Sequence, residues 1–487
     1  MGKRESFHRV DQSDRISQFP HRKVIYSLVR HNGAKIMKFL RLVLFSSIIF
    51  VAFASLSPAQ TAVKPATGKA PVIVIPGITG STLYNKKTNK EVWFKLTRPK
   101  DDDIRLPISP DLGKNRDLLE PRDIIRGVKI ASFLPEIEIY ERLIFSMEGS
   151  GGYREGTWEE PGEKGYEDTF YVFPYDWRRD NVENARILIN KIEKLKAKLR
   201  RPNLKFNIVA HSMGGLIARY AAMYGDADIP PGTPVATWAG AKHLDKIFLL
   251  GTPNDGSILA LRANLGGASL TSFVSIPAIQ NFTRYDAFTA PSLLQMLPSN
   301  EGLTIYDENF KRLPIDIYDP NTWDEYDWSV WKDPGFEREF SPVEQKLARP
   351  YFIAALDRAK RFQEALRSAR GVKVPVSFFV IGGDCKDTTN AAVLLWDEKR
   401  SHWETVIRPK AFVRSDGTRV TEAEVKARLT YKGDGTVALK SLVIDSMPQE
   451  ERDKFMPISG GMFQCEDHTK LVTSGEIQQK LLALLKQ

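Results

Sequence analysis

One segment constrains the fold of this chain more than any other, namely residues 205–224, KFNIVAHSMGGLIARYAAMY. Its first half is an apolar, β-branched run typical of a buried strand, and its second half has apolar residues at helical spacing. Between the halves, Ala210 and Gly214 are small residues placed two positions to either side of Ser212. A tight strand-to-helix turn of this kind holds a serine in a strained, exposed conformation. The segment therefore predicts a nucleophilic serine at the end of a buried strand.

Ser212 has an ordinary alternative, because serine is also a common helix N-cap. Ala210 stands where the usual motif has glycine, but alanine is the next smallest side chain, so the motif is weakened only slightly. The strand before the turn and the helix after it favour the nucleophile. The helix N-terminus would also place N–H groups and a partial positive charge beside Ser212.

Strand-like and helix-like segments alternate from Thr61 onward, which predicts an α/β domain with a largely parallel central sheet. A basic amphipathic helix with a solvated face is expected over residues 183–201. Between Ser257 and Pro375 the alternation gives way to an aromatic-rich, proline-punctuated region, which we interpret as an inserted cap at about 258–374 above the sheet. The expected strands of the sheet are residues 70–75, 170–173, 205–210, 246–250 and 375–381.

The positive charge of the chain is concentrated near its N-terminus. With 487 residues, of which 42% are hydrophobic, the chain can build a sizeable core, and its formal net charge is +10. Residues 1–59 contain ten Lys/Arg and three Asp/Glu, a net of +7, which leaves +3 for residues 60–487. A body so nearly balanced does not favour binding to nucleic acid or another polyanion.

The N-terminal segment has the organisation of an export signal. A short basic start at Met37–Arg41 precedes the apolar run Leu42–Leu56, and small residues follow up to Ala59. We expect export to the periplasm or the exterior with cleavage near Ala59, and Met37 is an alternative start to Met1. The other interpretation is an uncleaved membrane anchor, although the run is shorter than the ~20 residues of a spanning helix. Residues 60–487 would then form the folded domain.

The chain has two cysteines, Cys385 and Cys465. This number excludes a disulfide-dense scaffold and a cysteine-based zinc site. The two residues could pair in an oxidising compartment, which the sequence leaves open. We expect no metal and no cofactor.

A serine nucleophile needs a base, and the base needs an acid that orients it. On this strand-to-helix scaffold the chain order is serine, acid, histidine. Of the seven histidines, three lie in the leader and His243 precedes the next expected strand. His211 is adjacent to Ser212, and its side chain is expected to leave the turn in another direction. His402 and His468 remain as candidates for the base.

Asp434 is the favoured acid because it lies between two glycines at a loop tip, and Asp384, at a strand's end, is its rival. If Asp434 is the acid, His468 is the only histidine that follows it. The alternative for His468 is a surface histidine among acids or a weak metal ligand. His468 precedes a C-terminal amphipathic helix whose apolar face is Ile477, Leu481, Leu482 and Leu485.

Two backbone N–H groups are expected to stabilise the oxyanion that forms when the serine attacks. One belongs to Met213, directly after Ser212. We assign the other to Ile78, in the glycine-rich turn PGITGS at 76–81 after the first strand. A phosphate-binding role for this turn is set aside because no Lys-Ser/Thr pair follows in P-loop register.

Six motifs occur together and in order along the chain. They are VIPGITGS at Val74–Ser81, PYDWR at Pro174–Arg178, AHSMGG at Ala210–Gly215, LGTPNDGS at Leu250–Ser257, PSLLQMLP at Pro291–Pro298 and GDGTV at Gly433–Val437. Together they resemble the lecithin:cholesterol acyltransferase family of α/β-hydrolases. The resemblance extends from about Pro71 to the C-terminus, and the pair PYDWR and HSMGG is fairly specific.

The resemblance implies an α/β-hydrolase fold and an enzyme that cleaves a lipid ester such as a phospholipid, forms an acyl-serine, and passes the acyl group to a lipid alcohol or to water. By the same resemblance, Ser212, Asp434 and His468 fall on the family's triad positions, and Ile78 and Met213 on its oxyanion donors. The implied partners are a lipid ester and a lipid or membrane surface. The alternative is a non-catalytic lipid-binding protein, which would be expected to lack a triad member, whereas all three are present.

This chain also departs from the family. The extra disulfides of the mammalian members cannot form with two cysteines, so lipoprotein binding is not implied. The hairpin-like stretch Ala391–Val413, which contains Trp396 and Trp403, matches no family segment, and the cap at 258–374 matches only loosely. We expect these two regions to select the substrate.

Overall fold

The computed structural model describes residues 68–95, 103–128, 137–160, 166–267, 282–369, 371 and 373–486. The chain divides into Met1–Pro65 and Ala66–Gln487, and every described residue belongs to the second part. The expected leader, with its apolar run at 42–56 and cleavage near Ala59, lies outside the described residues. Within the described ranges, no helix combines the length and the apolar character that crossing a membrane requires.

Seven strands form the central sheet, and every pairing between neighbours is parallel. Their order across the sheet is β19-β12-β10-β9-β1-β8-β7. The predicted α/β architecture is therefore confirmed, and the five predicted strands correspond to β1, β8, β9, β10 and β12. The bounds are β1 Val72–Ile75, β7 Arg154–Glu155, β8 Thr169–Val172, β9 Phe206–His211, β10 Leu244–Leu250, β12 Ser377–Gly383 and β19 Ile458–Gln464.

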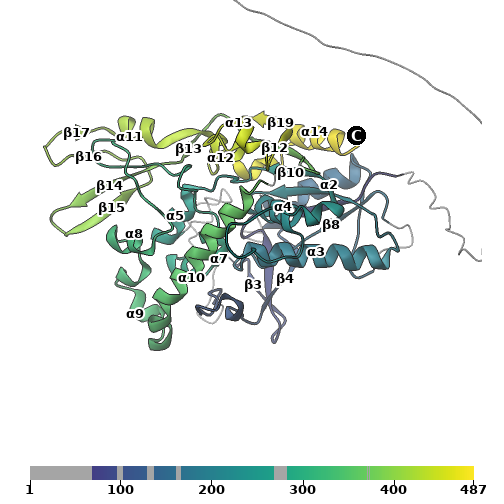
Figure 1. The fold of residues 1–487 in the computed structure, drawn as a ribbon, viewed down its shortest axis with the longest axis horizontal. Coiled ribbons are helices and arrows are strands. Elements are labelled where there is room, and N and C mark those ends of the chain that lie inside the picture. Colours follow the sequence, from purple (N-terminus) through teal and green to yellow (C-terminus); the bar gives the residue numbers. More distant parts are fainter. Residues whose placement is uncertain are drawn as a thin grey trace, which may run out of the picture. The chain divides into compact units, whose positions relative to one another are not determined.

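Helices cover both faces of this sheet, because alternate side chains of a strand point to opposite faces. Ile73 and Ile75 belong to a core shared with α3 (Asn181–Lys198) and α4 (Met213–Tyr224). Val72 and Val74 belong to a second core, shared with α2 (Glu141–Gly149) and α14 (Gly475–Lys486). The four apolar residues predicted for the C-terminal helix are all buried in that second core. Figure 1 shows the strands between these helices.

The predicted cap at 258–374 is built mostly of short helices between β10 and β12. Its last helix, α10, packs against α4, and the Tyr224 hydroxyl donates a hydrogen bond of 3.0 Å to the carbonyl oxygen of Ala365. This end of the insertion is thus part of the main core. The elements are α5 (Ile258–Gly266), α6 (Arg284–Phe288), α7 (Pro291–Leu294), β11 (Ile305–Tyr306), α8 (Pro320–Glu325), η4 (Val330–Lys332), α9 (Phe336–Glu339) and α10 (Pro342–Leu366).

The stretch at 391–413 does contain a hairpin, in which β14 (Ala392–Asp397) pairs with β15 (His402–Val406) and Trp396 faces Trp403. β14 also pairs with β11, so this hairpin is joined to the cap by backbone hydrogen bonds. A second pair, β16 (Phe412–Val413) and β17 (Arg419–Val420), follows, and then α11 (Glu422–Leu429). These elements share a small core and gather at one side of the domain in Figure 1.

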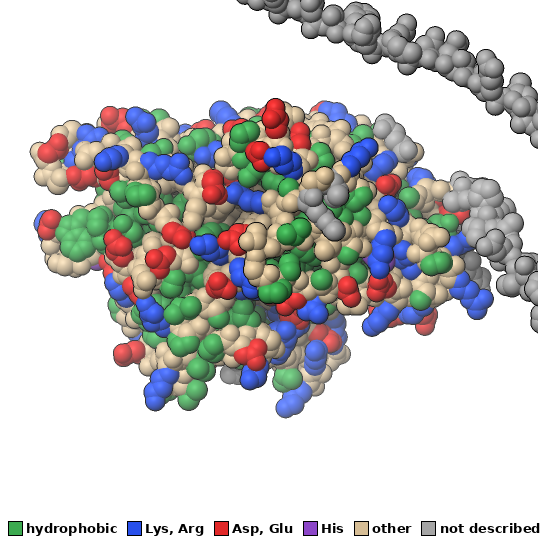
Figure 2. All heavy atoms as spheres, viewed as in Figure 1, with side chains coloured by type: hydrophobic (Ala, Val, Ile, Leu, Met, Phe, Trp, Pro, Cys, Tyr) green, Lys and Arg blue, Asp and Glu red, His purple; other side chains and the backbone are tan. Residues whose placement is uncertain are grey.

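Figure 2 shows acidic and basic side chains interspersed over the visible face, which agrees with the small net charge of residues 60–487.

The remaining elements connect the strands of the main sheet. The elements are β2 (Ser81–Asn85), β3 (Lys90–Trp93), η1 (Leu112–Lys114), β4 (Leu119–Ile124), β5 (Gly127–Val128), β6 (Ile137–Glu138), η2 (Ala239–Lys242), β13 (Lys386–Thr389), β18 (Thr430–Gly433), α12 (Leu439–Val443), α13 (Gln449–Arg452) and η5 (His468–Val472).

Candidate active site

Ser212 lies between the end of β9 and the start of α4, as the sequence predicts. Its backbone has φ 52° and ψ −127°, a conformation that costs free energy for any residue with a side chain. Although Ser212 is the residue before the helix, its side chain makes no capping hydrogen bond. The local geometry is therefore that of a strained strand-to-helix turn and differs from that of an N-cap serine.

Small residues allow the backbones around Ser212 to approach closely. A Cβ on Gly214 would lie 2.4 Å from the carbonyl oxygen of Pro76, and a Cβ on Gly77 would lie 2.9 Å from the Cβ of Ser212. The N–H of Ser212 donates a hydrogen bond of 2.7 Å to the carbonyl oxygen of Leu250 in β10. The turn is thus held between the loop after β1 and the end of the neighbouring strand.

Asp434 and His468 come from different loops at the same edge of the sheet and form a buried pair. Nδ1 of His468 lies 2.7 Å from Oδ2 of Asp434, and the backbone N–H of His468 donates to the backbone oxygen of Asp434 at 2.9 Å. The other carboxylate oxygen, Oδ1, accepts from the N–H groups of Thr436 and Val437 at 2.9 and 2.6 Å. Both orientation and tautomer of His468 are therefore set, with the proton on Nδ1.

The rival residues are placed elsewhere. Asp384 is exposed at the end of β12, and its N–H donates to the backbone of β19. His402 begins β15 on the hairpin. The structure thus brings Asp434 together with His468, the pair that the sequence favours.

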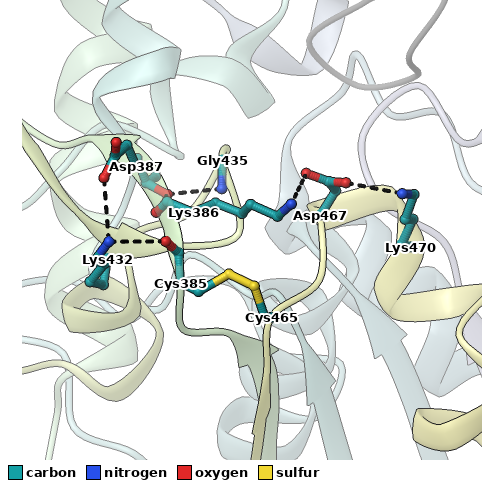
Figure 3. The surroundings of a disulfide bond; sticks show 9 residues. Cys385, Lys386, Asp387, Lys432, Gly435, Cys465, Asp467 and Lys470 are labelled. Carbon is teal, nitrogen blue, oxygen red and sulfur yellow. Dashed lines mark hydrogen bonds and ion pairs between the residues drawn. A yellow bond between two sulfur atoms is a disulfide. The ribbon is translucent and has the colours of Figure 1, made fainter.

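A disulfide joins the start of β13, the strand paired with the one before Asp434, to the segment that carries His468 (Figure 3). Cys385 directly precedes β13, which pairs with β18 just before Asp434, and Cys465 lies three residues before His468. The Cα atoms of the cysteines are 5.0 Å apart. The sequence left this pairing open, and the structure forms it.

Polar contacts flank the disulfide on both sides. Lys386 makes an ion pair with Asp467 at 3.6 Å, and Nζ of Lys432 donates to the carbonyl oxygen of Cys385 at 3.1 Å (Figure 3). These contacts, like the disulfide, link the β13–β18 ladder to the segment that follows β19.

Ser212 and His468 line the same pocket. Nε2 of His468 is buried and has no hydrogen-bond partner among the described residues. Since Nδ1 carries the proton toward Asp434, Nε2 is a free acceptor, as a general base requires. The other side chains of the pocket are mostly apolar and include Ile78, Phe94, Ile125, Ile139 and Val472.

The pocket beside Ser212 is lined by residues outside the cap and the hairpin, and their expected role in selecting the substrate stays a prediction. No described residue of 258–374 or 391–413 lines this pocket; Phe94, Ile125 and Ile139 come from the segments between β3 and α2 instead. Sequence reasoning missed these three lining residues because they lie in connections between short elements, without a recognisable motif.

His211 departs from the sequence prediction, since its side chain stays at the site. The rings of His211 and His468 lie with centroids 4.7 Å apart. Nδ1 of His211 is 2.8 Å from the hydroxyl of Tyr140, and its Nε2 is 3.2 Å from the carbonyl oxygen of His468. Burial, and next the neighbouring His468, hold the pKa of His211 well below 6.5. The only sequence signal was its position beside Ser212.

The two expected oxyanion donors flank Ser212. Met213 is the first residue of α4, so its N–H has no acceptor within the helix. Ile78 follows Gly77, which packs on Ser212, and both Ile78 and Gly77 line the pocket. The geometry places these residues where two N–H groups could meet an oxyanion next to Ser212.

Comparisons with known proteins point to one family. The family model described as lecithin:cholesterol acyltransferase matches residues 157–331. The chain is 26% identical over 353 residues to phospholipase A(1) LCAT3 of Arabidopsis thaliana, and the alignment covers 64% of this chain and 72% of that protein.

Two solved structures are also similar at low identity. A chain of the Tle4-Tli4 complex is 14% identical with a TM-score of 0.47, covering 86% of this chain and 98% of that chain. The mature lipase BlEst2 of Bacillus licheniformis is 11% identical with a TM-score of 0.34, covering 87% of this chain and 94% of that chain.

The family match includes Ser212 but ends before Asp434 and His468, whose pairing is a property of this chain's own structure. The resemblance predicted from the six motifs is confirmed by the family model and by the plant relative. The chain is similar to the lecithin:cholesterol acyltransferase family, and its parallel sheet with Ser212 at a strand-to-helix turn has the architecture of an α/β-hydrolase fold.

Proposed function

We propose that Ser212, His468 and Asp434 form a catalytic triad that transfers the acyl group of a lipid ester through an acyl-serine. The observation that carries the proposal is the buried Asp434–His468 pair: Nε2 of His468 has no hydrogen-bond partner among the described residues, and His468 lines the same pocket as the strained Ser212. The family match and the phospholipase A(1) relative support an acyltransferase or lipid ester hydrolase.

The proposed reaction proceeds by two acyl transfers. Nε2 of His468 takes the proton of the Ser212 hydroxyl while Oγ attacks the ester carbonyl, and Asp434 stabilises the imidazolium that forms. The N–H groups of Ile78 and Met213 stabilise the oxyanion, and the alcohol leaves with the proton from His468. A second alcohol or a water molecule then attacks the acyl-serine, giving a new ester or a free acid.

The pocket supports a lipid as the substrate, because an acyl chain would be buried against Phe94, Ile125, Ile139 and Val472. A phospholipid is the first donor to test, since the plant relative is named a phospholipase A(1). Whether the acceptor is a lipid alcohol or water depends on how well the acyl-serine is shielded from water.

We further propose that the protein works at a lipid surface after export. Two sequence features support export, namely the basic start with its apolar run at 42–56 and the small residues before residue 60. The Cys385–Cys465 disulfide agrees with an oxidising compartment.

The test uses the purified full chain with a phospholipid that carries a labelled acyl chain, with and without a sterol or a long-chain alcohol. Label in free fatty acid indicates hydrolysis, and label in a new ester that increases with acceptor concentration indicates acyl transfer. Ser212→Ala and His468→Gln are expected to lower either activity by roughly 10³-fold or more.

His243→Gln is the matched control, because His243 is also buried but lies before β10, away from the pocket. Its activity is expected to stay near that of the wild type. If no ester tested gives a product that depends on Ser212, the non-catalytic lipid-binding alternative replaces this proposal.

A further inference from the structure

We propose that Tyr140 and His211 form a positioning bridge that ties the oxyanion loop, which is the turn at 76–81 after β1, to His468, the proposed base. The inference rests on the proposed function of Ser212 and His468 and adds two residues to it. Neither residue belongs to the predicted triad or to the predicted oxyanion donors, yet both line the pocket beside Ser212.

The bridge is a continuous chain of three hydrogen bonds. The N–H of Gly77 donates to the Tyr140 hydroxyl at 2.8 Å, the hydroxyl lies 2.8 Å from Nδ1 of His211, and Nε2 of His211 lies 3.2 Å from the carbonyl oxygen of His468. One end is thus the residue before Ile78, and the other end is the backbone of the base.

The donors and acceptors allow one arrangement of protons. A backbone N–H can only donate and a carbonyl oxygen can only accept. Nε2 of His211 must therefore carry a proton, and the Tyr140 hydroxyl, which accepts from Gly77, donates its own proton to Nδ1. Every polar group of the bridge is satisfied when His211 is neutral.

This arrangement suits the chemistry next to it. His468 becomes an imidazolium during each acyl transfer, and its ring lies 4.7 Å from that of His211. A charged His211 at that distance would disfavour the imidazolium, whereas a neutral one does not. The titratable residues that contact His211 are Tyr140 and His468, and burial raises the pKa of Tyr140, so its hydroxyl keeps its proton.

The bridge also joins segments that are far apart in the sequence. Tyr140 immediately precedes α2, Gly77 follows β1, His211 ends β9, and His468 begins η5. Tyr140 and His211 are 71 positions apart, and His211 and His468 are 257 apart. Loss of one link would let the oxyanion loop and the base move relative to each other, and small displacements of reacting groups are costly in rate.

Tyr140→Phe tests the bridge, and Tyr153→Phe is its matched control. Tyr153 is buried in the same core as Tyr140, but its hydroxyl has no hydrogen-bond partner among the described residues. The steady-state rates and pH profiles of both variants and of the wild type are measured on one labelled phospholipid with the full chain, after thermal unfolding has shown that each variant is folded.

We expect Tyr140→Phe to lower kcat by about tenfold with little change in KM, because one buried hydrogen bond that positions reacting groups is lost. In this variant, Nδ1 of His211 no longer accepts a hydrogen bond from the Tyr140 hydroxyl. His211 is therefore more easily protonated, and the acid limb of the kcat/KM profile moves to higher pH. Tyr153→Phe should match the wild type in both respects. A variant His211→Gln, whose amide can still donate to His468, should retain more activity than His211→Phe.

The inference is overturned if the wild type is active and Tyr140→Phe has the kcat and pH profile of Tyr153→Phe. It is also overturned if both tyrosine variants change only in thermal stability. An inactive wild type on every ester would instead contradict the proposed function, so the two failures are distinguishable.

Discussion

Nδ1 of His468 lies 2.7 Å from Oδ2 of Asp434, although the two residues are 34 positions apart in the chain. A second hydrogen bond, between their backbones, holds the same pair at 2.9 Å. The carboxylate is fixed in turn by the N–H groups of Thr436 and Val437. Both side chains are therefore oriented in the absence of a substrate, and in the proposed reaction this avoids reorganisation.

Replacing the acid should affect activity far more than folding. Asp434→Asn keeps the size of the side chain but favours the wrong tautomer of His468, and we expect kcat to fall by on the order of 10³- to 10⁴-fold. Asp384→Asn, at the exposed rival position, should leave kcat unchanged. Steady-state rates of both variants on one labelled ester provide the measurement; equal losses in the two would contradict the assignment of Asp434.

Removing the disulfide should weaken both the fold and the site. With Cys385→Ser and Cys465→Ser together, we expect the free energy of unfolding to fall by about 2–4 kcal/mol, because the reduced unfolded chain gains freedom. Activity should also fall, since the covalent link between the β13–β18 ladder, which precedes Asp434, and the segment of His468 is lost. Urea denaturation and steady-state rates check these effects, and an unchanged urea midpoint would show that the disulfide adds no stability.

The close approach at Gly214 should not tolerate a methyl group. A Cβ there would lie 2.4 Å from the carbonyl oxygen of Pro76, so Gly214→Ala must push the oxyanion loop away from α4. We expect a loss of roughly 1–3 kcal/mol in stability and a lower kcat. Gly475→Ala is the control, because a Cβ at that position has no neighbour within 4 Å. Thermal unfolding and initial rates of both variants give the measurement, and equal stability and rates in the two would contradict the close approach at Gly214.

His243 should make the stability depend on pH. Burial, and then the positive charges of Lys196 and Lys242, lower its pKa from 6.5 to about 4. The folded state thus binds this proton less readily than the unfolded state. The free energy of unfolding is therefore highest, with respect to His243, above pH 6.5, and it falls by on the order of 2 kcal/mol as the pH decreases toward 4.

His243→Gln removes this titration, so the fall in unfolding free energy between pH 6.5 and 4 should be shallower in the variant than in the wild type. Urea denaturation at half-unit pH steps gives both curves. Parallel curves would mean that His243 contributes nothing to the acid sensitivity.

The buried strands of the sheet could be predicted because their composition is decisive. β1, β9 and β10 are largely apolar, and each is followed by a turn, at Pro76-Gly77, Ser212 and Gly251 respectively; the sequence predicts all three within a few residues of their bounds. The edge strand β19, ISGGMFQ, was missed because exposed and partly buried residues alternate along it and two of its residues are glycines. β7 has only two residues, too few for any periodic pattern.

The sequence by itself determined the strand-to-helix turn, the serine at its tip, and a short list of acids and histidines, because local composition and chain order limit each of these. Only the tertiary structure decided that Asp434 rather than Asp384 meets His468, that Cys385 pairs with Cys465, and that His211 turns toward the base. It also decided which segments line the pocket. Such relationships join residues tens to hundreds of positions apart, and they depend on how loops pack at the edge of the sheet, for which the periodicity of a sequence carries no signal.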